Sequence, residues 1–223
     1  MKKDRFIKLG ILAGVTMILS LLVCFVDKGI VGPKATSVGF SHINAFFAGI
    51  FSFNKPLYII TNLLGYLAIL ICLGFAFIGR SQLILGKSLK KVDRNIIALG
   101  VLYVVVIALY VIFEKAEINY RPIIMPGETE PEASFPSSHT MLALVVFCSA
   151  PWVLYKYIRD QKILKIVTIV MYALAAITVV GRLLSGVHWF TDIVAGVLIS
   201  ATLLYGFRIA LDMIKPKKKT AKK

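Results

Sequence analysis

The sequence predicts an all-α, polytopic membrane protein: a bundle of six transmembrane helices, with a further helix lying in the extracytoplasmic interface. Of the 223 residues, 58% are hydrophobic and only 17% are charged, whereas soluble domains carry about 25% charged residues. The mean hydropathy is +0.83. Several apolar segments reach or approach the roughly 20 residues that a helix needs to cross a bilayer. We therefore expect one membrane domain spanning residues 1–223.

The expected spans are apolar segments, and they occupy residues 6–26, 57–78, 96–113, 139–155, 166–184 and 189–210. The first is too long for the core of a signal peptide. It also lacks a small-residue cleavage site, because Val26 leads directly into Asp27 and Lys28. We therefore keep it as a membrane helix.

An aromatic segment at 40–53 separates the first two spans. Phe40, Ile43, Phe46 and Phe47 recur there at helical spacing, with polar residues between them. This pattern predicts an amphipathic helix in the outer interface. Such a helix either packs on the bundle or forms a lid that borders the path by which a lipid reaches a site.

The net charge of +15 is mainly a signal of membrane topology. Twenty of the 26 Lys and Arg residues fall on one side when the segment ends alternate, and positive residues mark the cytoplasmic side. We therefore expect a multi-pass plasma-membrane protein with both termini cytoplasmic. The basic tail at 214–223 is expected to contact anionic lipid rather than nucleic acid.

Five ionisable residues gather at the outer ends of the last four spans: Arg121, His139, Arg182, His188 and Asp192. The proline-rich connection at 114–138 is predicted to be an irregular loop on the same side. Ionisable residues beside spans are costly and mark functional sites. The cluster therefore predicts a site at the extracytoplasmic face.

The types and spacing of these residues indicate phosphoryl transfer. His188 and Asp192 are four residues apart and share one helix face, so the carboxylate can fix the tautomer of the imidazole and activate it as a nucleophile. Arg121 and Arg182 can each bind phosphate oxygens with two hydrogen bonds.

The fourth span opens with Pro136, Ser137, Ser138 and His139. The free backbone N–H groups of a helix start favour an anion such as a phosphate. His139 is placed to hand a proton to a leaving oxygen. Because the sequence offers no complete set of metal ligands, we expect metal-independent transfer through a phosphohistidine, without a cofactor.

These residues resemble the type 2 phosphatidic acid phosphatase (PAP2) superfamily. The family has three motifs, Lys-x6-Arg-Pro, Pro-Ser-Gly-His and Ser-Arg-x5-His-x3-Asp. The matching positions lie within 114–192, in the same order, and are Arg121-Pro122, Pro136-Ser137-Ser138-His139 and Arg182-x5-His188-x3-Asp192. The third motif is long and specific, whereas the first is short.

The resemblance implies a role for each matching residue. His188 would be the nucleophile, Asp192 its partner and His139 the acid, while Arg121, Arg182 and Ser137 would bind phosphate. The family's fold and activity imply an integral membrane lipid phosphatase.

Three positions depart from the motifs. Glu114 stands seven residues before Arg121, where the family has lysine, and Lys115 follows one place late. On a continuous helix, a step of six residues falls about 120° short of the face that a step of seven reaches. Lys115 would therefore need local unwinding to bind phosphate, so the family lysine is either displaced or absent. Ser138 replaces a glycine and Gly181 replaces a serine.

The sequence thus predicts a membrane phosphatase that acts on a lipid phosphate or pyrophosphate within the bilayer. The resemblance implies undecaprenyl pyrophosphate, phosphatidylglycerol phosphate or phosphatidic acid as substrate classes, and the sequence does not choose between them. Two alternatives remain: a lipid phosphotransferase, or a catalytically weak relative that binds or moves lipid phosphates. Glu114 favours the weak relative, because a carboxylate repels phosphate. The oligomeric state does not follow from the sequence.

Overall fold

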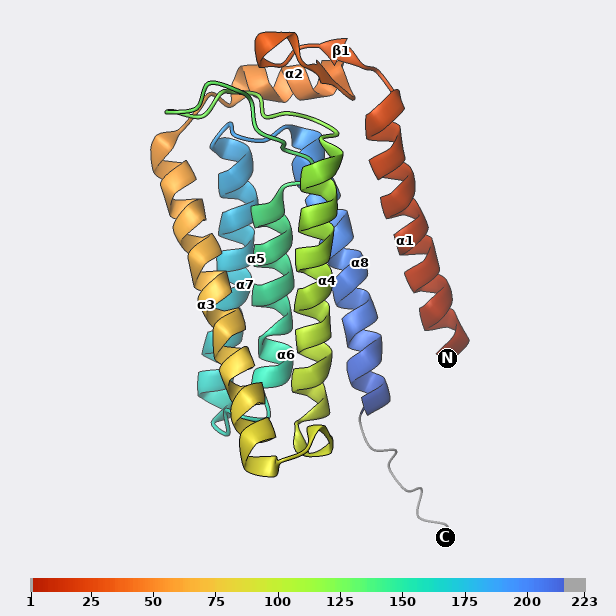
Figure 1. Ribbon diagram of the computed structural model, residues 1–223, viewed down its shortest axis with the longest axis vertical. Helices are drawn as coiled ribbons and strands as arrows, with labels where there is room; N and C mark the ends of the chain where they lie inside the picture. The colour runs from red at the N-terminus through yellow and green to blue at the C-terminus, as the bar shows by residue number, and fades with distance from the viewer. Residues whose placement is uncertain (1, 215–223) are drawn as a thin grey trace.

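The computed structural model describes residues 2–214, so the basic tail expected at 214–223 lies almost wholly outside the described residues. Within them, long helices run side by side and short elements cover one end of the bundle (Figure 1). The long helices are α1 (Lys2–Phe25), α3 (Lys55–Gly86), α4 (Arg94–Ala116), α7 (Gln161–Leu184) and α8 (Phe190–Ile214). The all-α membrane fold is confirmed.

Five helices among the described residues, α1, α3, α4, α7 and α8, are long and apolar enough to cross a membrane. The predicted count of six spans is not confirmed, because residues 139–155 form two shorter helices, α5 (Ser138–Ser149) and α6 (Pro151–Leu154). Helix α5 packs against α3, α4, α7 and α8 at the centre of the bundle. Its buried Val145, Val146 and Phe147 form the middle of the apolar core.

Polar side chains fix where several of the helices begin. Asn54, Asp93 and Asp160 each accept a hydrogen bond from a backbone N–H in the first turn of α3, α4 and α7, as N-cap residues do. At its other end, α4 stops where Glu117 takes a left-handed conformation, with φ of 45°. The chain then runs as an irregular loop to α5, as predicted.

The predicted interfacial helix is present as α2 (Ser41–Ile50). It lies across one end of the bundle, which we call the α2 end (Figure 1). Helix α2 is preceded by a two-stranded hairpin, which consists of β1 (Gly29–Ile30), the 3₁₀ turn η1 (Pro33–Ala35) and β2 (Ser37–Val38). A second 3₁₀ turn, η2 (Leu89–Lys91), joins α3 to α4 at the opposite end of the bundle. Helix α2 buries Ser41 and Asn44 and leaves Phe46 and Ile50 exposed. Such exposure of apolar side chains suits contact with lipid.

Asn44 ties α2 to the start of α8. Its Nδ2 donates to the carbonyl of Gly39 at 2.7 Å and to Oγ1 of Thr191 at 2.9 Å, and its Oδ1 accepts from the N–H of Thr191 at 3.1 Å. The side chain is completely buried, and a buried polar group left without its partner is destabilising. Phe47 adds a stacked contact with Phe190 at 4.2 Å between ring centroids.

We expect Asn44→Ala to lower the free energy of unfolding by about 1–3 kcal/mol, because it leaves three buried backbone and hydroxyl groups unpaired. Thermal unfolding in detergent measures the effect. The matched control is Ile43→Ala, whose side chain is 41% exposed on the same helix and whose loss is expected to cost less. An unfolding midpoint for Asn44→Ala at or above that of Ile43→Ala would refute the anchoring role.

Candidate active site

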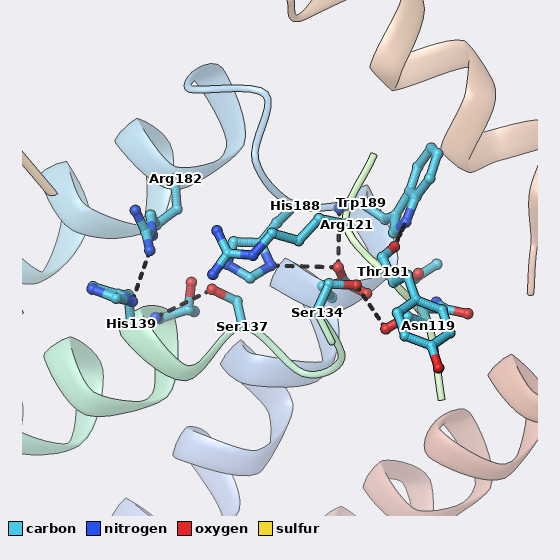
Figure 2. A network of polar contacts seen from close by, with 12 residues as sticks. Asn119, Arg121, Ser134, Ser137, His139, Arg182, His188, Trp189 and Thr191 are labelled. Carbon is cyan, nitrogen blue, oxygen red and sulfur yellow. Dashed lines mark hydrogen bonds and ion pairs between the residues drawn. The ribbon is translucent and has the colours of Figure 1, made fainter. Parts of the chain in front are cut away.

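The five ionisable residues that the sequence singled out lie close together, and Figure 2 shows four of them, Arg121, His139, Arg182 and His188. Asp192 adjoins His188. His139 lies in the first turn of α5, Arg182 in the last turn of α7 and Asp192 in the first turn of α8, while His188 lies in the turn between α7 and α8. Arg121 comes from the loop between α4 and α5. Helix α5 starts deeper in the bundle than α4 and α7 end (Figure 1), so the site is recessed.

His188 and Asp192 form the predicted pair. Nδ1 of His188 lies 3.4 Å from Oδ2 of Asp192, and both side chains are almost completely buried. The backbone N–H of Trp189 donates to the same carboxylate oxygen at 3.0 Å. Neither ring nitrogen meets hydrogen-bond criteria with another described residue. Because Nδ1 faces the carboxylate, Nε2 is the ring nitrogen left for chemistry.

The imidazole of His188 is held in its neutral form. Burial, followed by the positive charges of Arg121 and Arg182, holds its pKa well below the ordinary value. A neutral ring with its proton on Nδ1 carries a lone pair on Nε2. His188 is therefore prepared to act as a nucleophile.

Arg182 is a completely buried cation. Its Nη1 donates to Oγ1 of Thr61 at 3.2 Å and to Oδ1 of Asn62 at 3.0 Å, and its Cζ lies 5.3 Å from the ring centroid of Tyr58. Within residues 2–214, no carboxylate comes within ion-pair distance of it. A buried charge without a counter-ion is unfavourable, so the site is built to receive an anion.

Arg182 also fixes the tautomer of His139. Its Nη2 donates to Nδ1 of His139 at 2.8 Å, so Nδ1 is an acceptor and a neutral ring carries its proton on Nε2. Gly65 on α3 lies against this ring, because a Cβ at that position would come within 2.9 Å of Cδ2 of His139. The imidazole is thus held between α3 and α7.

Arg121 is held by its own loop. Its backbone N–H donates to the carbonyl of Glu132 at 2.9 Å, and its Nε lies 2.9 Å from Oε2 of Glu132. Nη1 contacts the sulfur of Met125 at 3.7 Å. The guanidinium is largely buried and close enough to His188 to influence its ionisation. Part of its charge is therefore balanced before any ligand binds.

The remaining predicted phosphate ligands are placed differently. Oγ of Ser137 accepts from the N–H of Thr140 at 3.4 Å, and the N–H of Ser137 donates to the carbonyl of Asp192 at 3.1 Å, so Ser137 joins the starts of α5 and α8. Ser138 lines the cavity described below. Lys115 is exposed and lies outside the cavity lining, because α4 stays helical to Ala116. Glu114 takes a place in the lining instead.

Two hollows meet at His139. A polar cavity of about 220 Å³ is lined by acidic, basic and hydroxyl side chains, which include Glu114, Arg121, Glu132, Ser138, His139 and His188. An apolar groove of about 590 Å³ adjoins it between α3 and α4. The two share the same junction residues, namely Tyr110, Arg121, Ser138, His139 and Met141. The aromatic segment that was expected either to pack on the bundle or to form a lid does not line the apolar groove. Its Phe47 and Phe51 line a separate small space beside His188.

Sequence reasoning missed several residues that support the site. Thr61 and Asn62 hold Arg182, and a polar pair inside an apolar span is a signal that could have revealed them. Asn119 is also buried; its Oδ1 accepts from the N–H of Gly39 at 3.2 Å, and its backbone carbonyl accepts from Oγ of Ser134 at 3.2 Å. Both side chains also interact with the carboxylate of Asp192.

Comparisons with known proteins concern the sequence family and the fold. The sequence model of the PAP2 superfamily matches residues 112–215. The structure is similar to the crystal structure of a transmembrane PAP2 type phosphatidylglycerolphosphate phosphatase from Bacillus subtilis, with a TM-score of 0.55 and 21% identity over 97% of this chain and 98% of that one. No curated protein sequence gives a significant match. The PAP2 resemblance and the multi-pass membrane fold are thus confirmed.

We expect the His188 ring to remain neutral at pH values below its ordinary pKa, because burial and the two arginines disfavour the imidazolium. NMR titration of the protein with isotope-labelled histidine measures this directly, with His188→Gln used to assign the signal. Arg121→Gln removes one positive neighbour and should move the titration to higher pH. A His188 ring that titrates at or above pH 6.5 in the unliganded protein would contradict the argument.

Proposed function

We propose that the chain is a membrane phosphatase that removes phosphate from a lipid phosphate through a phosphohistidine on His188. The observation that carries the proposal is the buried Arg182, which lacks a counter-ion and binds His139, while His139 and the free Nε2 of neutral His188 border one cavity. A nucleophile beside a buried arginine that lacks a counter-ion suits phosphoryl transfer. The resemblance to PAP2 enzymes supports the same activity.

The first step would form the N–P bond. Phosphate oxygens bind Arg121, Arg182 and the N-terminal region of α5 at Ser138. The lone pair on Nε2 of His188 attacks phosphorus, the bond to the lipid oxygen breaks, and His139 gives that oxygen a proton. The resulting phosphoimidazole is positively charged, and the Asp192 carboxylate beside Nδ1 stabilises it.

His139 needs a second proton before it can act as an acid. In the unliganded site, its Nδ1 accepts from Arg182, so the neutral ring holds a single proton on Nε2. When a phosphate draws the Arg182 guanidinium away, Nδ1 is free to take up a proton, and the imidazolium then donates from Nε2. Substrate binding would thus create the acid that the reaction needs.

The second step would regenerate the enzyme. A water molecule attacks phosphorus, His139 accepts the proton that the water loses, and the N–P bond breaks with its electron pair returning to Nε2 of His188. The two histidines and two arginines supply every role, so we propose that no metal takes part. Within residues 2–214, no group of His, Cys, Asp or Glu is arranged to hold a metal ion.

The apolar groove supports a lipid substrate. Val106, Ile107 and Leu142 line it, and it meets the cavity at His139. A phosphate in the cavity can therefore keep its tail among the helices. The Bacillus subtilis neighbour acts on phosphatidylglycerolphosphate, which keeps that lipid beside phosphatidic acid and undecaprenyl pyrophosphate as candidates. The excess of positive residues at the opposite end supports an extracytoplasmic site.

Release of inorganic phosphate from a panel of these lipids, with and without chelator, tests the proposal. We expect turnover that survives the chelator, and we expect loss of turnover in His188→Ala and His139→Ala. His42→Ala is the matched control, since His42 lies on α2 outside the cavity lining. Retained activity in His188→Ala would overturn the mechanism. Binding of the lipids without phosphate release would favour the catalytically weak relative, for which Glu114 is the best argument.

A second prediction concerns the groove. Ile69→Trp fills part of the groove and should raise KM for a long-chain lipid phosphate several-fold, while KM for a short-chain analogue changes little. Leu70→Trp is the control, because Leu70 is 62% exposed and lies outside the groove lining. Equal effects of Ile69→Trp on both chain lengths would show that the groove does not hold the tail.

A further inference from the structure

Glu114 is an acidic side chain that the proposed mechanism does not use. It lies one helical turn beyond Tyr110 on α4 and lines the polar cavity together with Arg121, His139 and His188. No hydrogen bond or ion pair joins its carboxylate to any residue in 2–214. Its negative charge therefore acts on whatever occupies the cavity.

The acidic side chains nearly balance the two arginines of the site. Arg121 and Arg182 supply two positive charges, whereas Glu114 and Glu132 supply two negative charges to the cavity lining. Glu132 is already paired with Arg121 at 2.9 Å. Lys55 lines a separate pocket on the far side of Glu132, and Lys115 is exposed outside the cavity. This count leaves no net positive charge for a second phosphate, and Arg182 is the cation that no acidic side chain pairs among residues 2–214.

The position of Glu114 determines which part of a substrate meets its charge. In the proposed mechanism the reacting phosphate lies near His188, and the lipid tail leaves through the groove past the junction that Tyr110, Ser138 and Met141 line. In a lipid diphosphate, the second phosphate lies between the reacting phosphorus and the tail, and therefore at this junction. Arg121 is the cation there, and Glu114 stands one turn away from Tyr110.

We propose that Glu114 makes the site selective for a lipid phosphate monoester over a lipid diphosphate. The inference rests on the proposed function and narrows its substrate class. A monoester places its charge between the two arginines, whereas a diphosphate adds a further anionic group beside an unpaired carboxylate. Glu114 is exposed at the rim of the cavity in the unliganded protein, so solvent screens part of this repulsion. Like charges brought together still disfavour the wrong ligand and so produce specificity.

Farnesyl phosphate and farnesyl diphosphate test the proposal because they differ only in the second phosphate. We expect the wild-type protein to favour the monoester in kcat/KM by about tenfold, the size of a modest charge repulsion. Glu114→Gln should reduce this ratio several-fold by improving the diphosphate. Glu114→Lys should reduce it further, which is a gain of activity that misfolding cannot produce. Glu128→Gln removes the same charge outside the cavity lining and should leave the ratio unchanged.

Binding of the phosphonate and methylenediphosphonate analogues with the same farnesyl tail provides a readout that needs no turnover. Tighter binding of the diphosphonate by Glu114→Gln, with binding of the phosphonate little changed, supports the proposed selectivity. If neither farnesyl phosphate nor farnesyl diphosphate is hydrolysed, only the phosphatase function is overturned. A wild-type preference for the diphosphate overturns the selectivity. The selectivity is also overturned if Glu114→Gln and Glu114→Lys leave the monoester-to-diphosphate ratio of kcat/KM at its wild-type value.

Discussion

The unbalanced charge of Arg182 is the constraint around which this site is organised. A buried guanidinium needs hydrogen-bond partners; Thr61, Asn62 and His139 accept three of its bonds, and its Nε has none among the described residues. None of these partners is charged in the unliganded site, so the positive charge itself stays uncompensated. The cost of burying the cation would be offset when an anion binds, so the proposed phosphate affinity follows from how the bundle is packed.

The rest of the fold holds His139 and His188 close to Arg182. The recessed start of α5 brings His139 to the end of α7, and the bond from Ser137 to the carbonyl of Asp192 fixes α5 against α8. On the other side, Asn44 joins the interfacial helix α2 to Thr191, beside Asp192. His188, the proposed nucleophile, is thus supported by segments that are far apart in sequence but share one network of buried polar bonds.

The sequence predicted the ionisable residues of the site, since Arg121, His139, Arg182, His188 and Asp192 have few structural uses beside apolar spans. It also predicted the interfacial helix, from the spacing of aromatic residues. It could not predict that residues 139–155 would form a short, broken helix, because apolar composition does not distinguish a central helix from one that spans a bilayer. The sequence also could not predict the structural roles of Asn44 and Asn119, because tertiary contacts determine their hydrogen-bond partners. The sequence left open whether Lys115 reaches the phosphate; in the structure Lys115 is exposed, and Glu114 lines the cavity instead.

The account depends on a covalent bond between phosphorus and Nε2 of His188. Rapid mixing with a lipid phosphate labelled on its phosphorus, an alkaline quench and peptide mapping by mass spectrometry would detect it, because phosphohistidine survives alkali. We predict label on the peptide that contains His188, with slower loss of that label in His139→Ala, where the water lacks its base. Label on a different residue, or wild-type turnover with no labelled protein at any time, would contradict the account.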